Sequence, residues 1–349
     1  MIRVLVVDDS RFFRKRLVEI INSDKALTVC GVGCNGQEAI ELCHTLKPDV
    51  ILMDIEMPVL DGISAVRAII KQDPLPILMY SSKTQQGARS TFEALEAGAV
   101  DYIAKDIHDP IGGLEKTRLD LINRIKLLAS RKEVGFFEKY LKLGKPRHVF
   151  PKEEQSRTQL ILIGASTGGP VAVQELILNL PKDFSVPIVV VQHMPGAFTE
   201  SYAARLNHLS ALKVVEGTNG ELLEPGKVII APGGTHVSFF FQSLHACLKV
   251  APPNHYTPYN PSLDDAFTSA ASIFHEHILA IILTGMGDDG MKGVKELKKY
   301  NSKVWVQDQE SSVIWGMPGK VYHSGYCDEI VNLMDMANRI IQEVGHREN

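Results

Sequence analysis

The sequence predicts an α/β protein with two domains, each built on a mainly parallel sheet. Over the first 130 residues, short β-branched runs recur at regular intervals and end near Val7, Val32, Met53, Tyr80 and Ala104. The intervals of 21 to 27 residues accommodate one strand and one helix each, which favours a parallel sheet with helices on both faces. Strand patterns return at Gln159, and the length of 349 residues fits about two domains.

Helical patterns lie between the strands of the first domain. Two of them cover Gln37–Leu46 and Thr84–Glu96, and a last amphipathic helix is expected over 111–130. The segment 131–158 is rich in charge and contains glycine and proline, which indicates a linker with one or two helical turns around Phe136–Leu143. We therefore place the first domain at residues 1–125, the linker at 126–158 and the second domain at 159–345.

The second domain repeats the alternation of strands and helices. Its apolar runs suit buried parallel strands and cover Leu160–Ile163, Val186–Val191, Val228–Ala231, Ile278–Leu283 and Val304–Val306. Helical patterns cover 171–179, 197–208 and 264–276, and the stretch Val237–Val250 indicates an antiparallel piece. We therefore expect a second doubly wound, mainly parallel α/β fold.

The composition excludes several classes of protein. Hydrophobic residues make up 45% and charged residues 22%, which are ordinary globular values. The net charge of −4 provides no general attraction to nucleic acid, and the longest apolar runs are too short to span a bilayer. Two aspartates interrupt the first apolar run, a pattern that is not typical of a secretory signal peptide. The five cysteines form no CxxC pair. We therefore expect a cytoplasmic protein with reduced thiols, no nucleic-acid partner and no direct membrane insertion.

Polar side chains follow four strands of the predicted first sheet. In chain order they are Asp8, Asp9, Asp54, Ser81 and Lys105. Because the carboxyl ends of parallel strands meet at one edge of a sheet, we expect these side chains to lie close together. Oxygen ligands favour a hard cation, most simply Mg²⁺, and a carboxylate in such a pocket can form an aspartyl phosphate. The competing interpretation is that loops after strands simply favour Asp and Ser.

The segments VVDDS, LMDIEMPVLDG, MYSS and YIAKD resemble the signature segments of response-regulator receiver domains over about residues 1–125. The resemblance implies a flavodoxin-like (βα)5 fold with Asp54 as the phosphoacceptor. It also implies a Mg²⁺ site, whose ligands would be Asp8, Asp9, Asp54 and the backbone of Glu56.

The same resemblance implies further roles around the phosphoacceptor. Ser81 and Lys105 would read the phosphoryl group, and Tyr102 lies where the family keeps a switch aromatic. The sequence departs from the family at Asp106, where a proline usually follows the lysine. This departure bears on the loop after Lys105 and not on the phosphorylation chemistry.

A serine in the second domain is the candidate nucleophile. Ser166 lies in the G-x-S-x-G segment Gly164–Gly168, between a strand and a helical pattern, an arrangement that lifts a serine hydroxyl above a sheet. The alternative is a glycine loop that cradles phosphate at a helix N-terminus.

Two further residues strengthen the catalytic interpretation. His193 follows the second predicted strand of this domain, and Asp289 follows the strand Ile278–Leu283. Both should project from the same edge of the sheet as Ser166, as a base and an orienting carboxylate require. The order Ser–His–Asp differs from the Ser–Asp–His order of α/β-hydrolases and indicates a different fold. His236 and His255 also follow loops and stay alternatives for the base.

The segments GASTGGP, QHMPGAFTESYAARLN, APGGTH, NPSLDDAF and ILTGMGDDG resemble the catalytic domain of the CheB family of chemotaxis protein-glutamate methylesterases, over about residues 160–320. The resemblance implies a catalytic triad of Ser166, His193 and Asp289. Thr167 and the backbone of Met286 would contact the oxyanion or the substrate. Asn260 stands where relatives often carry a basic residue, which bears on contacts with the substrate peptide.

Together the two resemblances imply a phosphorylation-activated esterase. It would hydrolyse γ-glutamyl methyl esters on methyl-accepting chemoreceptors by acyl transfer and also deamidate receptor glutamines. A chemotaxis histidine kinase would be the phosphodonor, and the cytoplasmic helices of the chemoreceptors would be the substrate. Mg²⁺ in the receiver domain would be the cofactor, with none expected for the esterase domain. The alternative is a non-enzymatic regulator whose second domain only binds a partner.

Overall fold

The structure is a computed structural model that describes residues 1–105, 113–130 and 157–345. The chain forms two compact units, Met1–Leu143 and Gly144–Asn349. Three predictions lie outside the described residues. They are the helical turns at Phe136–Leu143, most of the linker, and the departure from the receiver-domain pattern at Asp106. Within the described residues, no helix is long and apolar enough to cross a membrane.

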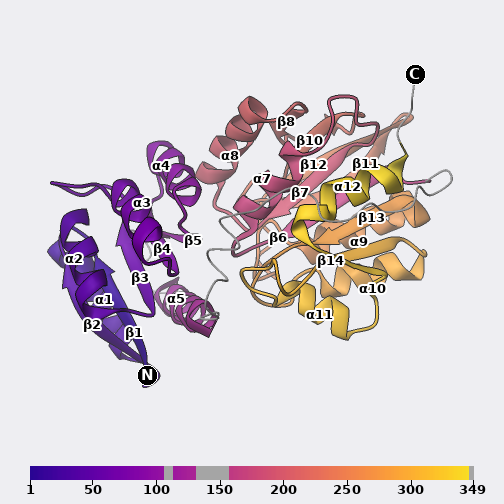
Figure 1. Cartoon of the computed structure of the whole chain (residues 1–349). Helices are drawn as coiled ribbons and strands as arrows, with labels where there is room; N and C mark the ends of the chain where they lie inside the picture. Colours follow the sequence, from indigo (N-terminus) through magenta and orange to yellow (C-terminus); the bar gives the residue numbers. More distant parts are fainter. Residues whose placement is uncertain (106–112, 131–156, 346–349) are drawn as a thin grey trace. The chain divides into compact units, whose positions relative to one another are not determined.

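The first unit has the expected alternation of strands and helices (Figure 1). Its elements are β1 (Ile2–Val7), α1 (Arg11–Asn22), β2 (Leu27–Gly33), α2 (Gly36–Leu46), β3 (Val50–Asp54), α3 (Gly62–Gln72), β4 (Ile77–Ser82), α4 (Gln85–Glu96), β5 (Asp101–Lys105) and α5 (Gly113–Ser130). The five strands are parallel in the order β2-β1-β3-β4-β5. Helix α5 continues to Ser130, beyond the domain end that we placed at residue 125.

Side-chain caps explain where three helices of the first unit begin. The side chain of Asn35 accepts from the Glu38 amide at the start of α2, and Asp61 does the same for α3. Thr84 caps α4 through the Gly87 amide. Each cap satisfies a backbone donor that the helix itself leaves unpaired. The caps therefore fix the residues at which α2, α3 and α4 begin.

The second unit contains a seven-stranded parallel sheet in the order β15-β14-β13-β6-β7-β10-β8. The strands are β6 (Leu160–Ala165), β7 (Ile188–Gln192), β8 (Lys213–Glu216), β10 (Lys227–Ile230), β13 (Ile278–Ile282), β14 (Lys303–Gln307) and β15 (Glu329–Val331). The domain starts in the middle of the sheet at β6, extends through β7 to one edge and returns through β13 to the other. In such doubly wound sheets, ligands bind beside the strand where the order reverses.

Helices cover both faces of this sheet (Figure 1). One face has α7 (Gly169–Leu178), α8 (Gly196–Leu209) and α12 (Leu333–Val344), and the other has α9 (Leu263–Phe274), α10 (Met291–Lys299) and α11 (Met317–His323). A short 3₁₀ helix, η1 (His275–His277), follows α9. A separate antiparallel sheet consists of β11 (His236–Gln242), β12 (His245–Ala251) and β9 (Glu221–Leu222). It confirms the antiparallel pattern expected over Val237–Val250.

The predicted elements of the second domain are present with small shifts in their bounds. Strand β7 begins at Ile188 rather than Val186, and Pro187 just before it has no amide hydrogen to donate to a neighbouring strand. Strands β8 and β15 and the helices α10 to α12 were not predicted from the sequence. These strands are three or four residues long, too short for a periodic pattern to stand out.

Candidate active site

Three side chains meet at the carboxyl ends of neighbouring strands in the second unit. Ser166 follows β6, His193 follows β7, and Asp289 lies in the loop after β13. Nδ1 of His193 lies 3.2 Å from Oγ of Ser166, and its Nε2 lies 2.7 Å from Oδ2 of Asp289. The structure therefore brings together the three residues singled out from the sequence, with the histidine in the middle.

The alternative histidines have other surroundings. Nδ1 of His236 lies 3.1 Å from the carboxylate of Asp265, and His255 is exposed in the loop that follows β12. His193 is the histidine that contacts Ser166. The structure therefore favours His193 as the base over both of them.

Backbone turns at glycines raise Ser166 above the sheet. Gly168 adopts a φ of 75°, a left-handed conformation that favours glycine, and the Gly169 amide donates to the Ser166 carbonyl at 2.7 Å. A Cβ atom on Gly285 would lie 2.8 Å from Cβ of Ser166 and 2.4 Å from Sδ of Met317. The strand-end loop of β13 can therefore approach the serine closely only because position 285 has no side chain.

The carboxylate of Asp289 is held by five donors. Its Oδ2 accepts from His193 and from the Leu263 amide, and its Oδ1 accepts from the Ser262 hydroxyl and from the amides of Asp264 and Gly290. Three of these groups belong to the cap and first turn of α9, where the helix dipole favours a negative charge. Burial alone would raise the pKa of Asp289, but the hydrogen bonds from His193, Leu263 and Asp264 and the proximity of His193 outweigh it, so the pKa lies below its usual value.

This geometry determines which nitrogen of His193 carries the proton. An ionised carboxylate can only accept hydrogen bonds, so Nε2 of neutral His193 must donate to Asp289. Nδ1 is then the acceptor, and it faces the hydroxyl of Ser166. The ring is therefore in the tautomer that can remove the serine proton.

Gln192 joins the serine and histidine backbones and was missed in the sequence analysis. Its fully buried side chain donates from Nε2 to the carbonyls of Ser166 at 3.0 Å and His193 at 3.2 Å. The sequence signal that could have identified Gln192 was a polar residue at the end of an apolar strand, directly before the candidate base. This amide keeps the ends of β6 and β7 in register at the site.

Thr167 and Met286, which are predicted to contact the oxyanion, are close in sequence to Ser166 and Asp289 and differ in burial. Thr167 is 1% exposed, and its hydroxyl has no hydrogen-bond partner among the described residues. Met286 is half-buried in the loop after β13, next to Gly285, which contacts Ser166. A buried hydroxyl without a partner is costly in a folded protein and common at catalytic sites. Both contacts stay predictions.

Replacing Thr167 with valine tests the first of them. We expect kcat to fall about 10²–10³-fold, the usual cost of losing one oxyanion donor. The thermal midpoint should not fall, because the removed hydroxyl makes no hydrogen bond within the part of the chain that is described. Turnover and thermal unfolding of the same preparation check both results. An unchanged kcat would exclude the hydroxyl as a necessary donor.

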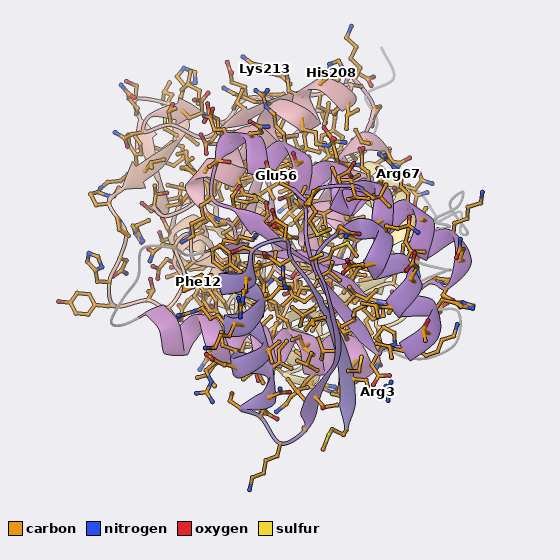
Figure 2. All side chains as sticks on the ribbon, turned by 90° about the vertical axis from the view of Figure 1, so that its left-hand side faces the viewer. Arg3, Phe12, Glu56, Arg67, His208 and Lys213 are labelled. Atoms are coloured by element: carbon orange, nitrogen blue, oxygen red, sulfur yellow. The ribbon has the colours of Figure 1, made fainter. Side chains whose placement is uncertain are left out.

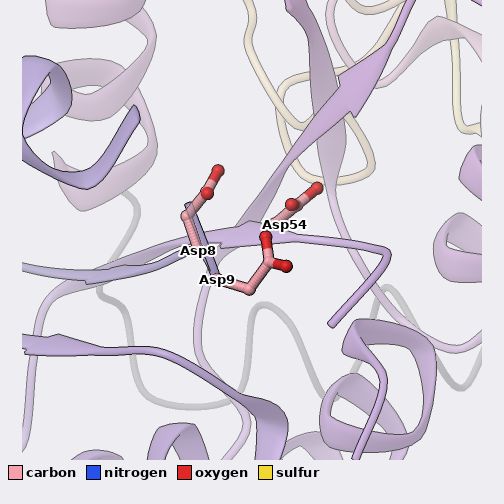
Figure 3. A group of neighbouring side chains, drawn as sticks. All are labelled: Asp8, Asp9 and Asp54. Carbon is pink, nitrogen blue, oxygen red and sulfur yellow. The ribbon is translucent and has the colours of Figure 1, made fainter. Parts of the chain in front are cut away.

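A second cluster of polar side chains lies at the carboxyl ends of the strands in the first unit. The carboxylates of Asp8, Asp9 and Asp54 each offer an oxygen within 4.8 Å of the others, and Figure 3 shows them gathered at one edge of the sheet. Nζ of Lys105 lies 2.9 Å from Asp8 and 2.6 Å from Asp54. Burial raises the pKa of Asp54 to about 6, with Asp8 adding to the effect and Lys105 opposing it. The oxygen-only donor set and the repulsion among the carboxylates fit a hard divalent cation.

The remaining predicted residues of this pocket have distinct surroundings. The hydroxyl of Ser81 donates to the Gly87 carbonyl of α4 and accepts from Thr91, so in this structure α4 holds it. Tyr102 is buried on β5. Glu56 is exposed on the face of the first unit that Figure 2 turns toward the viewer. The roles of these three residues stay predictions.

Comparison with known proteins identifies the family. The sequence matches the family model described as CheB methylesterase over residues 161–340, and that described as response regulator receiver domain over residues 4–111. A Vibrio cholerae protein named protein-glutamate methylesterase/protein-glutamine glutaminase 1 is 41% identical, with 99% of each chain covered. The chain belongs to the CheB family.

Other CheB proteins agree with this assignment. A Saccharophagus degradans protein with the same name is 41% identical over 98% of this chain and 99% of its own. The crystal structure of the Thermotoga maritima CheB methylesterase catalytic domain is 39% identical and has a TM-score of 0.52, covering 53% of this chain and 98% of that one. The expected family, fold class and enzyme class are therefore confirmed: the chain is a CheB methylesterase with a receiver domain in front of it.

Proposed function

We propose that this chain hydrolyses γ-glutamyl methyl esters on chemoreceptors, and deamidates receptor glutamines, by acyl transfer at Ser166. The observation that carries the proposal is the position of His193, 3.2 Å from the Ser166 hydroxyl and 2.7 Å from the Asp289 carboxylate. The names of full-length relatives support the substrate class. The hydrogen-bonded serine favours a nucleophile over a phosphate-cradling loop.

Proton transfer through His193 accounts for both activities. Nδ1 takes the proton of Ser166 as Oγ attacks the γ-carbonyl carbon, and the hydroxyl of Thr167 and the amide of Met286 stabilise the oxyanion. The proton then passes from Nδ1 to the leaving group, which departs as methanol from an ester or as ammonia from a glutamine. Water, deprotonated by the same nitrogen, hydrolyses the acyl-enzyme to glutamate and regenerates Ser166.

Methyl-labelled receptor membranes provide the direct test. The chain should release labelled methanol from them, and ammonia from receptors that carry glutamine at the same positions. A regulator that only binds a partner would release neither. Release of methanol that continues unchanged without a functional Ser166 would contradict the proposed site.

The receiver domain controls this activity through phosphorylation of Asp54 by a chemotaxis histidine kinase. Support comes from the clustered carboxylates, the adjacent Lys105 ammonium and the match to receiver domains over residues 4–111. Mg²⁺ would be held by the side chains of Asp8, Asp9 and Asp54 and by the backbone of Glu56. The ion would supply positive charge to the phosphoryl oxygens. Lys105 would hold a phosphoryl oxygen, and Ser81 would leave Gly87 to bind another. A cytoplasmic location is part of this proposal.

Replacing Asp54 with asparagine tests the control. A small phosphodonor such as acetyl phosphate should raise wild-type methanol release, and each 1.4 kcal/mol of bias changes the ratio of active to inactive molecules about tenfold. The Asp54→Asn chain should stay at its basal rate, because the amide cannot accept the phosphoryl group.

The surface variant Asp73→Asn, at the end of α3, is the matched control and should respond like the wild type. A chain without residues 1–140 should also ignore the phosphodonor, and a raised basal rate in it would indicate that the receiver inhibits the esterase. An Asp54→Asn chain that responds fully would contradict control through Asp54.

A further inference from the structure

The ring of Tyr259 lies flat against the ring of His193. Their centroids are 4.1 Å apart and their planes differ by 3°, so the two rings are stacked face to face. Tyr259 belongs to the loop between β12 and α9, far in sequence from β7, which His193 follows. No periodicity or motif in the sequence links Tyr259 to His193.

The loop that carries Tyr259 is held by hydrogen bonds within the loop and by one from Gly234. The amide of Asn254 donates to Oδ1 of Asn260 at 2.8 Å, and Nδ2 of Asn260 donates back to the Asn254 carbonyl at 3.3 Å. The Gly234 amide donates to the Asn260 carbonyl at 2.9 Å. The Thr257 hydroxyl donates to the Tyr259 carbonyl at 3.1 Å. The stacked position of the tyrosine is therefore supported by its backbone.

The stack supplies a constraint that the hydrogen bonds of His193 lack. The contacts to Ser166 and Asp289 lie at opposite nitrogens, so they leave the ring free to tilt about the line that joins those atoms. An aromatic face at 4.1 Å opposes that tilt. The same face attracts a cation, and His193 becomes an imidazolium when it takes the serine proton.

We propose that Tyr259 is a positioning residue that holds the His193 ring in its catalytic plane and stabilises its protonated form during acyl transfer. This inference rests on the role proposed for His193. The aromatic ring, rather than the phenolic hydroxyl, is the active part of the side chain. Because the stack acts on the base during proton transfer, its loss should reduce kcat and leave KM unchanged.

The experiment compares two substitutions of Tyr259 in the full-length chain, with soluble methylated chemoreceptor fragments as substrate. We expect Tyr259→Leu to lower kcat about 3- to 30-fold with KM unchanged, and Tyr259→Phe to keep kcat within about twofold of the wild type. Tyr256→Leu, in the same loop but fully exposed, is the matched control and should behave like the wild type. Wild-type kcat in Tyr259→Leu, equal losses in both variants of Tyr259, or a raised KM with unchanged kcat would each overturn the inference.

Proton NMR of the His193 ring separates positioning from a general loss of structure. A stacked aromatic ring shifts the carbon-bound imidazole protons upfield, so the shift should persist in Tyr259→Phe and vanish in Tyr259→Leu. No difference between the two spectra would overturn the inference. A parallel Ser166→Ala chain tests the proposed triad by itself. An inactive Ser166→Ala beside a fully active Tyr259→Leu would refute only the role of the stack, whereas an active Ser166→Ala would refute the triad.

Discussion

Replacing Ser166 with alanine is expected to lower kcat by about 10⁴–10⁶-fold, as the loss of a triad nucleophile does in serine hydrolases. The structure explains the size of this effect, because the Ser166 hydroxyl is the group that lies 3.2 Å from Nδ1 of His193. Without it, the base has no serine proton to remove and no acyl-enzyme forms. Methanol release from methyl-labelled receptors, measured at saturating substrate, gives the result.

The fold should survive this change. Alanine removes one oxygen atom, while the backbone contacts of position 166 to Thr284, Gly169 and Gln192 stay in place. The thermal midpoint should therefore remain close to that of the wild type. Ser272→Ala, at an exposed position of α9, is the matched control and should keep full activity. Activity of Ser166→Ala above about 1% of the wild type would be inconsistent with covalent catalysis at this serine.

The rule that polar residues after parallel strands share one edge was enough to predict that Ser166, His193 and Asp289 lie close together. Ser166, His193 and Asp289 each follow a strand with a strong apolar pattern, and the pairing of β13, β6 and β7 brings them together. The same rule found Asp8, Asp9 and Asp54. Sequence patterns succeed here because strand ends are determined by local hydrophobic runs.

The residues that support these groups were harder to find. Gln192 acts through backbone carbonyls, and Tyr259 reaches His193 from an irregular loop, so neither contact leaves a periodic signal. The hydroxyl of Ser81 donates a hydrogen bond to the Gly87 carbonyl of α4. A serine at a strand end does not by itself indicate this contact. Such contacts depend on loop conformation and side-chain rotamers, which tertiary packing decides.

The carboxylate of Asp289 acts only as a hydrogen-bond acceptor, so its replacement by asparagine is expected to have a large effect on kcat. Five donors converge on its two oxygens: the Nε2 of His193, the Ser262 hydroxyl and the amides of Leu263, Asp264 and Gly290. An asparagine would place an NH₂ group against some of these donors in either orientation. The orientation that keeps the three contacts of Oδ1 turns the NH₂ group toward His193 and Leu263.

In that orientation the amide donates to Nε2 of His193, so the neutral imidazole must carry its proton on Nδ1. Nδ1 then donates to Ser166 and cannot take its proton, and we expect Asp289→Asn to lower kcat about 10⁴-fold with the fold retained. Methanol release and thermal unfolding check the two parts of this expectation. The neighbouring Asp288 is exposed, and Asp288→Asn should remain active. If Asp288→Asn lost activity and Asp289→Asn kept it, the orienting carboxylate would be Asp288, and the hydrogen bond from Nε2 of His193 to Asp289 would not be the one that sets the tautomer.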